Sequence, residues 1–155
     1  MTSTEPPTPT GVQIPIQLLD PGLPLPAYAH AGDAGADLFA RESVVVPAGS
    51  GRVLVPTGVA IALPTGWAGF VQPRSGLALN HGVTVLNSPG LIDSGYRDEL
   101  KVILVNTDPS EDYQVVRGDR IAQLVVRPVA EASFEPVDVL PPSGRDVGGF
   151  GSSGK

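Results

Sequence analysis

The chain has 155 residues, which is the length of one ordinary domain with a hydrophobic core. It contains no cysteine, so disulfides, thiolate metal sites and cysteine nucleophiles are excluded. The formal charge of −6 argues against nucleic acid as a partner, because binding to its backbone rests on many Lys and Arg contacts. Residues 1–10 lack the features of a signal peptide, and no apolar run approaches the roughly 18 residues of a membrane span. We therefore expect a soluble, cytoplasmic protein without a membrane partner.

The two ends differ in composition from the body of the chain. Residues 1–10 are mostly Thr, Pro and Ser and bury too little apolar surface to become ordered. From residue 141 the sequence is PPSGRDVGGFGSSGK, which is rich in glycine and has a single aromatic residue. We therefore predict a disordered N-terminus at 1–10, one β domain at 11–140 and a flexible tail at 141–155.

The body of the chain is divided into short segments by 19 glycines and 17 prolines. Segments rich in Val, Ile and aromatic residues between these breaks are typical of strands. We predict strands at 12–19, 36–40, 43–48, 52–64, 67–73, 83–87, 99–106, 113–116 and 120–129. One short helix is expected at 75–82, closed by Asn80 and Gly82. The pattern indicates an all-β fold, a small jelly-roll barrel rather than an α/β protein.

Two of the predicted strands differ in the faces that they present. In 59–63 the larger side chains Val59, Ile61 and Leu63 alternate with alanines, which predicts one face turned to the core. The run KVILV at 101–105 has apolar residues on both faces. A strand that is buried on both sides suggests that another subunit covers its second face.

The segment PRSG (73–76) places polar groups between a strand and the predicted helix. Arg74 has the fork geometry that matches phosphate oxygens, and free backbone amides at a helix start favour an anion. The alternative is a structural capping turn. The sequence by itself supports both interpretations equally.

A second polar group lies in the Gly- and Pro-containing turn of residues 85–102, which we interpret as a wide hairpin. Asn87, Asp93 and Tyr96 lie around this turn, where an open backbone can contact a ligand. Asp93 is a candidate general base for a water molecule, although aspartate is also a common turn residue. Asp37 and Asp119 are further carboxylates beside strand residues, and each fits a turn, an ion pair or a distant magnesium contact.

Five segments of the chain resemble, in sequence and in order, the five motifs of the trimeric deoxyuridine triphosphatase (dUTPase) family. Their residues are most similar to those of its actinobacterial branch. They are AGDAGADLFA (31–40), PRSGLALNHG (73–82), NSPGLIDSGYRDELKV (87–102), GDRIAQLVV (118–126) and SGRDVGGFGSSG (143–154). The resemblance implies a distorted jelly roll of the β-clip type with one short helix. It also implies a homotrimer that exchanges its C-terminal segments and has active sites at the subunit interfaces.

The resemblance assigns roles to residues around the third motif. Asp93 corresponds to the aspartate that deprotonates the water attacking the α-phosphate of dUTP. Tyr96 corresponds to the tyrosine beneath the deoxyribose, where a ribose 2′-hydroxyl has no space. The uracil pocket corresponds to Asn87 and the backbone of Leu91, Ile92 and Asp93, and Lys101 lines the same site. The products are dUMP, the precursor for thymidylate synthesis, and pyrophosphate, and hydrolysis keeps uracil out of DNA.

The other motifs correspond to the triphosphate contacts. Arg74, Ser75 and Gly76 resemble the phosphate-binding turn, Gln123 a contact from a neighbouring chain, and Asp37 the aspartate that organises the site. In the tail, Phe150 resembles the residue that stacks on uracil, and Arg145, Gly151 and Ser152 belong to the segment that reaches the nucleotide from a third subunit. The family uses Mg²⁺ held by the three phosphates and by water, with no direct protein ligand.

Two other functions compete with dUTP hydrolysis. The dCTP deaminase family shares the fold and much of the third motif, but it carries a catalytic glutamate on the following strand, where this chain has Ile103. A nucleotide-binding module without catalysis would not require Asp93, Tyr96, Arg145 and Phe150 together. Both alternatives are therefore disfavoured.

We predict that the tail from Ser143 onward closes over bound nucleotide as a lid. Ordering about a dozen residues costs on the order of 1 kcal/mol each, and stacking of Phe150 returns about 1 to 3 kcal/mol, so closure should be only marginally favourable. Truncation after Pro142 should leave a folded enzyme that binds dUTP and turns it over far more slowly, because water exclusion is lost. Steady-state kinetics of the truncated chain test this. Unchanged turnover would refute the lid.

Overall fold

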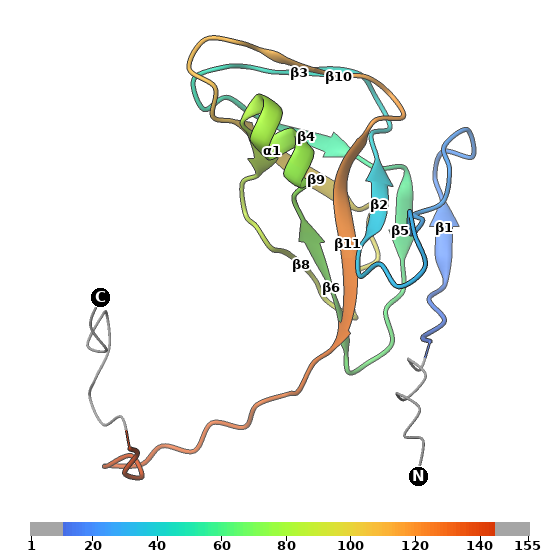
Figure 1. Ribbon diagram of the computed structural model, residues 1–155. Helices are drawn as coiled ribbons and strands as arrows, with labels where there is room; N and C mark the ends of the chain where they lie inside the picture. The colour runs from blue at the N-terminus through green and yellow to red at the C-terminus, as the bar shows by residue number, and fades with distance from the viewer. Residues whose placement is uncertain (1–10, 145–155) are drawn as a thin grey trace, which may run out of the picture.

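The computed structural model describes residues 11–144 of the chain, and these form short strands with one short helix. Figure 1 shows the strands gathered in one body, with the chain after the last strand leading away from it. The elements are β1 (Ile16–Leu18), β2 (Ala36–Phe39), β3 (Val44–Val46), β4 (Arg52–Pro56), β5 (Val59–Ile61), β6 (Trp67–Gln72), α1 (Ser75–His81), β7 (Val83–Val85), β8 (Gly90–Ile92), β9 (Lys101–Asn106), β10 (Tyr113–Val115) and β11 (Arg120–Pro128). The prediction of an all-β fold with one short helix is confirmed.

The strands pair into four antiparallel sheets within the described part of the chain, and these sheets do not close into one barrel. The largest has the order β2-β11-β6-β8, the next β4-β9-β7, and β1-β5 and β10-β3 form two-stranded pairs. Consecutive strands usually enter different sheets, which is how a jelly roll encloses its core with short segments. In Figure 1 the β3–β10 pair lies at one end of the body, beyond α1.

The predicted strand 52–64 is interrupted, and this corrects the expectation of one continuous element. Gly58 has a φ of 75°, a left-handed conformation that an L side chain rarely adopts, and a Cβ there would lie 3.1 Å from the Cβ of Asp20. The chain turns at this glycine, so β4 pairs with β9 and β5 pairs with β1. One apolar run therefore supplies two sheets.

The short helix and the wide hairpin are found close to the positions that the sequence predicts. A turn forms at Gly118, which has a φ of 90°, and the amide of Asp119 donates to the carbonyl of Val116 at 2.9 Å. The strands on either side of this turn, β10 and β11, belong to different sheets. The helix α1 ends at His81, and Gly82 caps it in the left-handed conformation. The wide hairpin also exists, because β7 pairs with β9. Its middle forms a strand that we did not predict, β8, which leaves the hairpin to pair with β6.

The hydrophobic core lies between the sheets. Val59, Ile61 and Leu63 are part of it, as their alternation predicted. In β9, Val102 and Leu104 are almost fully buried, whereas Ile103 is half-buried and pairs with Leu54, which is exposed. The outer face of β9 is thus apolar and partly open to solvent in the single chain, and its burial by another subunit stays a prediction.

Asn106, at the end of β9, is the one fully buried polar side chain in the part of the chain that the structure describes. Its amide group donates to the carbonyls of Val46 and Glu111 at 3.1 and 2.8 Å, and its Oδ1 accepts from the amide of Asp108 at 3.0 Å. These bonds join β3, β9 and the loop before β10, so Asn106 stabilises the meeting point of three segments.

Replacing Asn106 by alanine should lower the free energy of unfolding by about 2 to 4 kcal/mol, because two carbonyls and one amide lose their partner inside the protein. Denaturant titration at matched protein concentration measures the loss. The control is Gln114→Ala, which removes an exposed amide side chain bonded to Val44 and Val115 and should cost less than about 1 kcal/mol. Equal losses for the two variants would contradict this account.

Candidate active site

A cavity of about 160 Å³ opens beside β8 and β9. It forms because β8 leaves the β7–β9 hairpin to pair with β6, which opens the hairpin between its two sides. Five predicted site residues line it, namely Asn87, Leu91, Ile92, Tyr96 and Lys101. Val71, Val85, Gly90, Val102 and Ile103 complete the wall, and the prediction omitted these residues. These residues share no local pattern, because Val102 and Ile103 are neighbours on β9 and project to opposite faces of the strand.

Gly90 sets the width of this cavity at its base. It pairs with Val71 of β6, and a Cβ on Gly90 would lie 3.2 Å from the Cβ of Val71 and 3.6 Å from Nδ2 of Asn87. A side chain here would crowd the Cβ of Val71, whereas its contact with Asn87 would be ordinary. The glycine therefore permits a narrow slot, a shape suited to a flat ring.

The turn after β8 places Asp93 and Tyr96 next to each other. The amide of Tyr96 donates to the carbonyl of Asp93 at 3.1 Å, and the Tyr96 hydroxyl donates to the carbonyl of Glu99 at 2.9 Å. Tyr96 lines the cavity, whereas Asp93 is exposed and borders an adjoining hollow with Trp67 and Glu131. The structure thus brings the two residues to one turn and does not place the Asp93 carboxylate inside the cavity.

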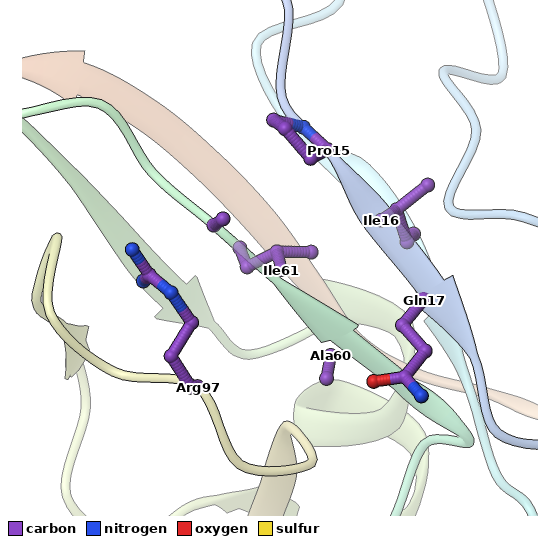
Figure 2. Close-up of a pocket in the computed structure, with 7 residues that line it drawn as sticks. Pro15, Ile16, Gln17, Ala60, Ile61 and Arg97 are labelled. Atoms are coloured by element: carbon purple, nitrogen blue, oxygen red, sulfur yellow. The ribbon is translucent and has the colours of Figure 1, made fainter.

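Arg97, which follows Tyr96, lines a different hollow from Tyr96. Arg97 lies beside Pro15, Ile16 and Ile61 in an apolar hollow over the β1–β5 pair, and Figure 2 shows its guanidinium near the β5 side of that hollow. Its Nη1 also donates to the carbonyl of Ser94 at 2.6 Å. Neighbouring residues of one segment therefore line two separate hollows.

A second cluster of predicted residues surrounds Asp37 on β2. Its carboxylate is buried and lies 3.6 Å from Nε of Arg74 and 3.6 Å from Nη1 of Arg120. Arg74 also donates from Nη1 to the carbonyl of Arg120 at 3.2 Å. Oδ1 of Asp37 and Nε of Arg74 are buried and make no hydrogen bond, so the pair attracts by charge at a distance longer than a hydrogen bond.

Strand pairing adds Gln123 to this cluster. Gln123 on β11 lies opposite Asp37 on β2 and opposite Gln72 on β6. Ser75 and Gly76 follow Arg74 at the start of α1, and both are exposed. The predicted residues of the second and fourth motifs thus meet at one end of the largest sheet, with the first-motif aspartate beneath them.

The two clusters lie on opposite sides of β6. The sheet order is β2-β11-β6-β8, so the Asp37 cluster is attached through β11 and the cavity through β8. The guanidinium of Arg74 is directed toward β2 and β11, away from β8. The remaining predicted residues, Arg145, Phe150, Gly151 and Ser152, lie outside the described residues.

Two features are absent from residues 11–144. In that range no group of three or more His, Asp or Glu side chains is arranged to hold a metal ion. Nor is any helix there long and apolar enough to cross a membrane.

Comparison with known proteins identifies the family of this chain. The dUTPase family model matches residues 22–154. The chain is 58% identical over 143 residues to the deoxyuridine 5′-triphosphate nucleotidohydrolase of Thermobifida fusca, covering 92% of this chain and 79% of that protein. It is 60% identical over 130 residues to the enzyme of the same name from Leifsonia xyli, covering 84% and 85%.

Among solved structures, the dUTPase of Staphylococcus bacteriophage 80alpha with dUPNHPP superposes with a TM-score of 0.82 at 27% identity, covering 92% of this chain and 99% of that one. Fold and site thus define a β-clip protein with a narrow pocket and a separate arginine-containing cluster. The family match identifies it further, and the chain belongs to the dUTPase family.

Proposed function

We propose that this protein hydrolyses dUTP to dUMP and pyrophosphate. The observation that carries this proposal is the narrow cavity beside β8, which has Tyr96 in its wall and Asp93 on the same turn. The related proteins from Thermobifida fusca and Leifsonia xyli bear the name of this activity. The phage relative holds dUPNHPP, a nucleotide of the same class.

In this proposal the cavity binds the base and the sugar. Uracil enters the slot above Gly90, where the Asn87 side chain and the backbone of Leu91, Ile92 and Asp93 supply donors and acceptors for its edge. The Tyr96 ring lies beneath the deoxyribose and excludes a 2′-hydroxyl. Lys101 lines the same cavity and contributes a positive charge near the nucleotide.

The Asp37 cluster binds the triphosphate. Arg74, Ser75, Gly76 and Gln123 supply the contacts, and Asp37 keeps the guanidinium of Arg74 in place through its charge. Mg²⁺ bound through the three phosphates and water would supply positive charge that offsets part of the phosphate charge, while Arg74 and Gln123 hold the triphosphate from the protein side. We assign no residue of this chain as a direct magnesium ligand.

Catalysis follows from the position of Asp93 beside the pocket. Its carboxylate accepts a proton from a water molecule, and the water oxygen forms a bond to the α-phosphorus. The bond from the α-phosphorus to the oxygen bridging it to the β-phosphate breaks, and pyrophosphate leaves with that oxygen. Because Asp93 is exposed in the single chain, a neighbouring subunit or the tail must exclude bulk water from it.

A complete site requires more than one copy of the chain, and we propose a homotrimer that exchanges its C-terminal segments. The cavity and the Asp37 cluster are held on opposite sides of β6. After β11, the apolar side chains Phe134, Val139 and Leu140 are 91%, 83% and 80% exposed in the single chain. Such a segment gains by packing on a neighbour, because each buried apolar side chain contributes about 1.5 to 3 kcal/mol. The tail then continues toward a neighbouring site as the lid.

The deaminase alternative lacks its acid–base group. Ile103 stands where that family carries its glutamate, and this isoleucine lines the cavity. The cavity wall contains no carboxylate among the described residues. Deamination of a cytosine ring therefore has no carboxylate for proton transfer among the described residues of the cavity wall.

Two measurements test the proposed function. The wild-type enzyme should release pyrophosphate from dUTP with a kcat/KM far above that for dCTP, dTTP or UTP. Replacing Asp93 by asparagine should keep the fold and dUTP binding while turnover falls about 10² to 10⁴-fold, the usual contribution of a general base. Binding of dUTP by calorimetry and hydrolysis by pyrophosphate release separate the two effects. Turnover within a few-fold of wild type would rule out Asp93 as the base.

A further inference from the structure

Glu99 lies between two residues of the cavity wall, Tyr96 and Lys101, but does not line the cavity itself. Its side chain is 12% exposed, and its Oε1 accepts two hydrogen bonds. One comes from the amide of Gly58 at 2.8 Å and the other from Nη1 of Arg41 at 3.2 Å. A carboxylate with these partners is held in one position.

The backbone carbonyl of Glu99 accepts the hydroxyl of Tyr96 at 2.9 Å. The next residue is fixed as well, because the amide of Leu100 donates to the carbonyl of Val59 at 2.8 Å. Oγ1 of Thr57 donates in turn to the carbonyl of Leu100 at 2.6 Å. The acceptor of the Tyr96 hydroxyl is thus attached to the turn between β4 and β5.

Arg41, which binds the Glu99 carboxylate, also belongs to an ion network with Asp20 and Arg117. Its Nη2 donates to the carbonyl of Leu19 at 3.1 Å, and its Nε lies 3.7 Å from Oδ2 of Asp20. Arg117 pairs with Asp20 through both of its terminal nitrogens and also donates to the carbonyl of Arg41 at 2.7 Å. The hydrogen bond from Arg117 holds the pKa of Asp20 below its usual value, so this carboxylate stays charged in the folded protein.

We propose that Glu99 is a positioning residue for Tyr96, and that it sets the discrimination between deoxyribose and ribose. Tyr96 is 38% exposed, so its ring has little packing to fix it and depends on the hydrogen bond of its hydroxyl. The Glu99 carboxylate, clamped by Arg41 and Gly58, keeps the acceptor of that bond in place. Positioning within a fraction of an ångström is what decides whether a single hydroxyl fits. The part of this inference that concerns sugars rests on the proposed function.

The test compares two carboxylate-to-amide changes in the same network. Glu99→Gln removes the ion pair with Arg41. Asp20→Asn removes the pair with Arg117 and the longer contact with Arg41 Nε, but leaves both hydrogen bonds to Glu99 Oε1 in place. The ratio of kcat/KM for dUTP to kcat/KM for UTP should fall about tenfold in Glu99→Gln and stay within about twofold of wild type in Asp20→Asn. Arg41→Gln removes the same contact from the other side and should act like Glu99→Gln. An unchanged ratio in both Glu99→Gln and Arg41→Gln overturns the proposal.

A double-mutant cycle shows whether Glu99 acts through the Tyr96 hydroxyl. Tyr96→Phe removes that hydroxyl, so Glu99→Gln added to it should cause no further loss of the ratio. A second loss of the same size would mean that Glu99 acts by another route, which contradicts the proposal. Thermal melting of each variant identifies losses that come from unfolding.

The positioning itself can be measured without any substrate. The chain has three tyrosines, so protein labelled with fluorotyrosine gives few fluorine resonances, and the one that disappears in Tyr96→Phe belongs to Tyr96. Glu99→Gln should shift or broaden this resonance, and Asp20→Asn should not. If wild-type protein fails to hydrolyse dUTP, the proposed function fails while this result still decides the positioning. An unchanged Tyr96 resonance in Glu99→Gln overturns the positioning role.

Discussion

The hydrogen bonding of β6 to two neighbours is the constraint on which the site depends. A strand has two edges, and in β6 one edge pairs with β11 and the other with β8. The first pairing brings Gln123 and Asp37 beside the end of β6, and the second opens the narrow cavity at Gly90. From β2 to β8 there are three strand spacings, or about 14 Å. The guanidinium of Arg74, held beside Asp37 and the carbonyl of Arg120, lies on the β11 side of β6, whereas β8 lies on the other side.

The sequence predicted the types of elements well, because strands and the helix depend on local residue patterns. Alternating apolar residues marked most strands, and the helix and its closing glycine followed from ordinary capping chemistry. The grouping of Asn87, Leu91, Ile92, Tyr96 and Lys101 in one cavity agrees with the third motif. The catalytic and binding roles of these residues stay predictions.

What the sequence did not predict depends on pairing between distant segments. The break at Gly58 separates β4, which pairs with β9, from β5, and the strand β8 forms by pairing with β6. These strand partners were not predicted from the local sequence. The role of Glu99 also depends on distant segments. In the sequence YRDELK it resembles an ordinary surface acid, and only the structure shows that Gly58 and Arg41 donate hydrogen bonds to its carboxylate. Residues that act by holding another residue leave no motif of their own.

The central claim is that one active site combines the Asp93 side of one chain with the Arg74 side of another. Coexpressed Asp93→Asn and Arg74→Ala chains, each inactive as a pure trimer, test it most directly. Random assembly should restore about a quarter of the wild-type sites, because each mixed trimer contains one interface with both residues intact. A control pair with both changes on one side, Asp93→Asn with Tyr96→Ala, should stay inactive. Recovery of hydrolysis in the first mixture, in particles with the mass of three chains, is the predicted result, and no recovery would contradict the account.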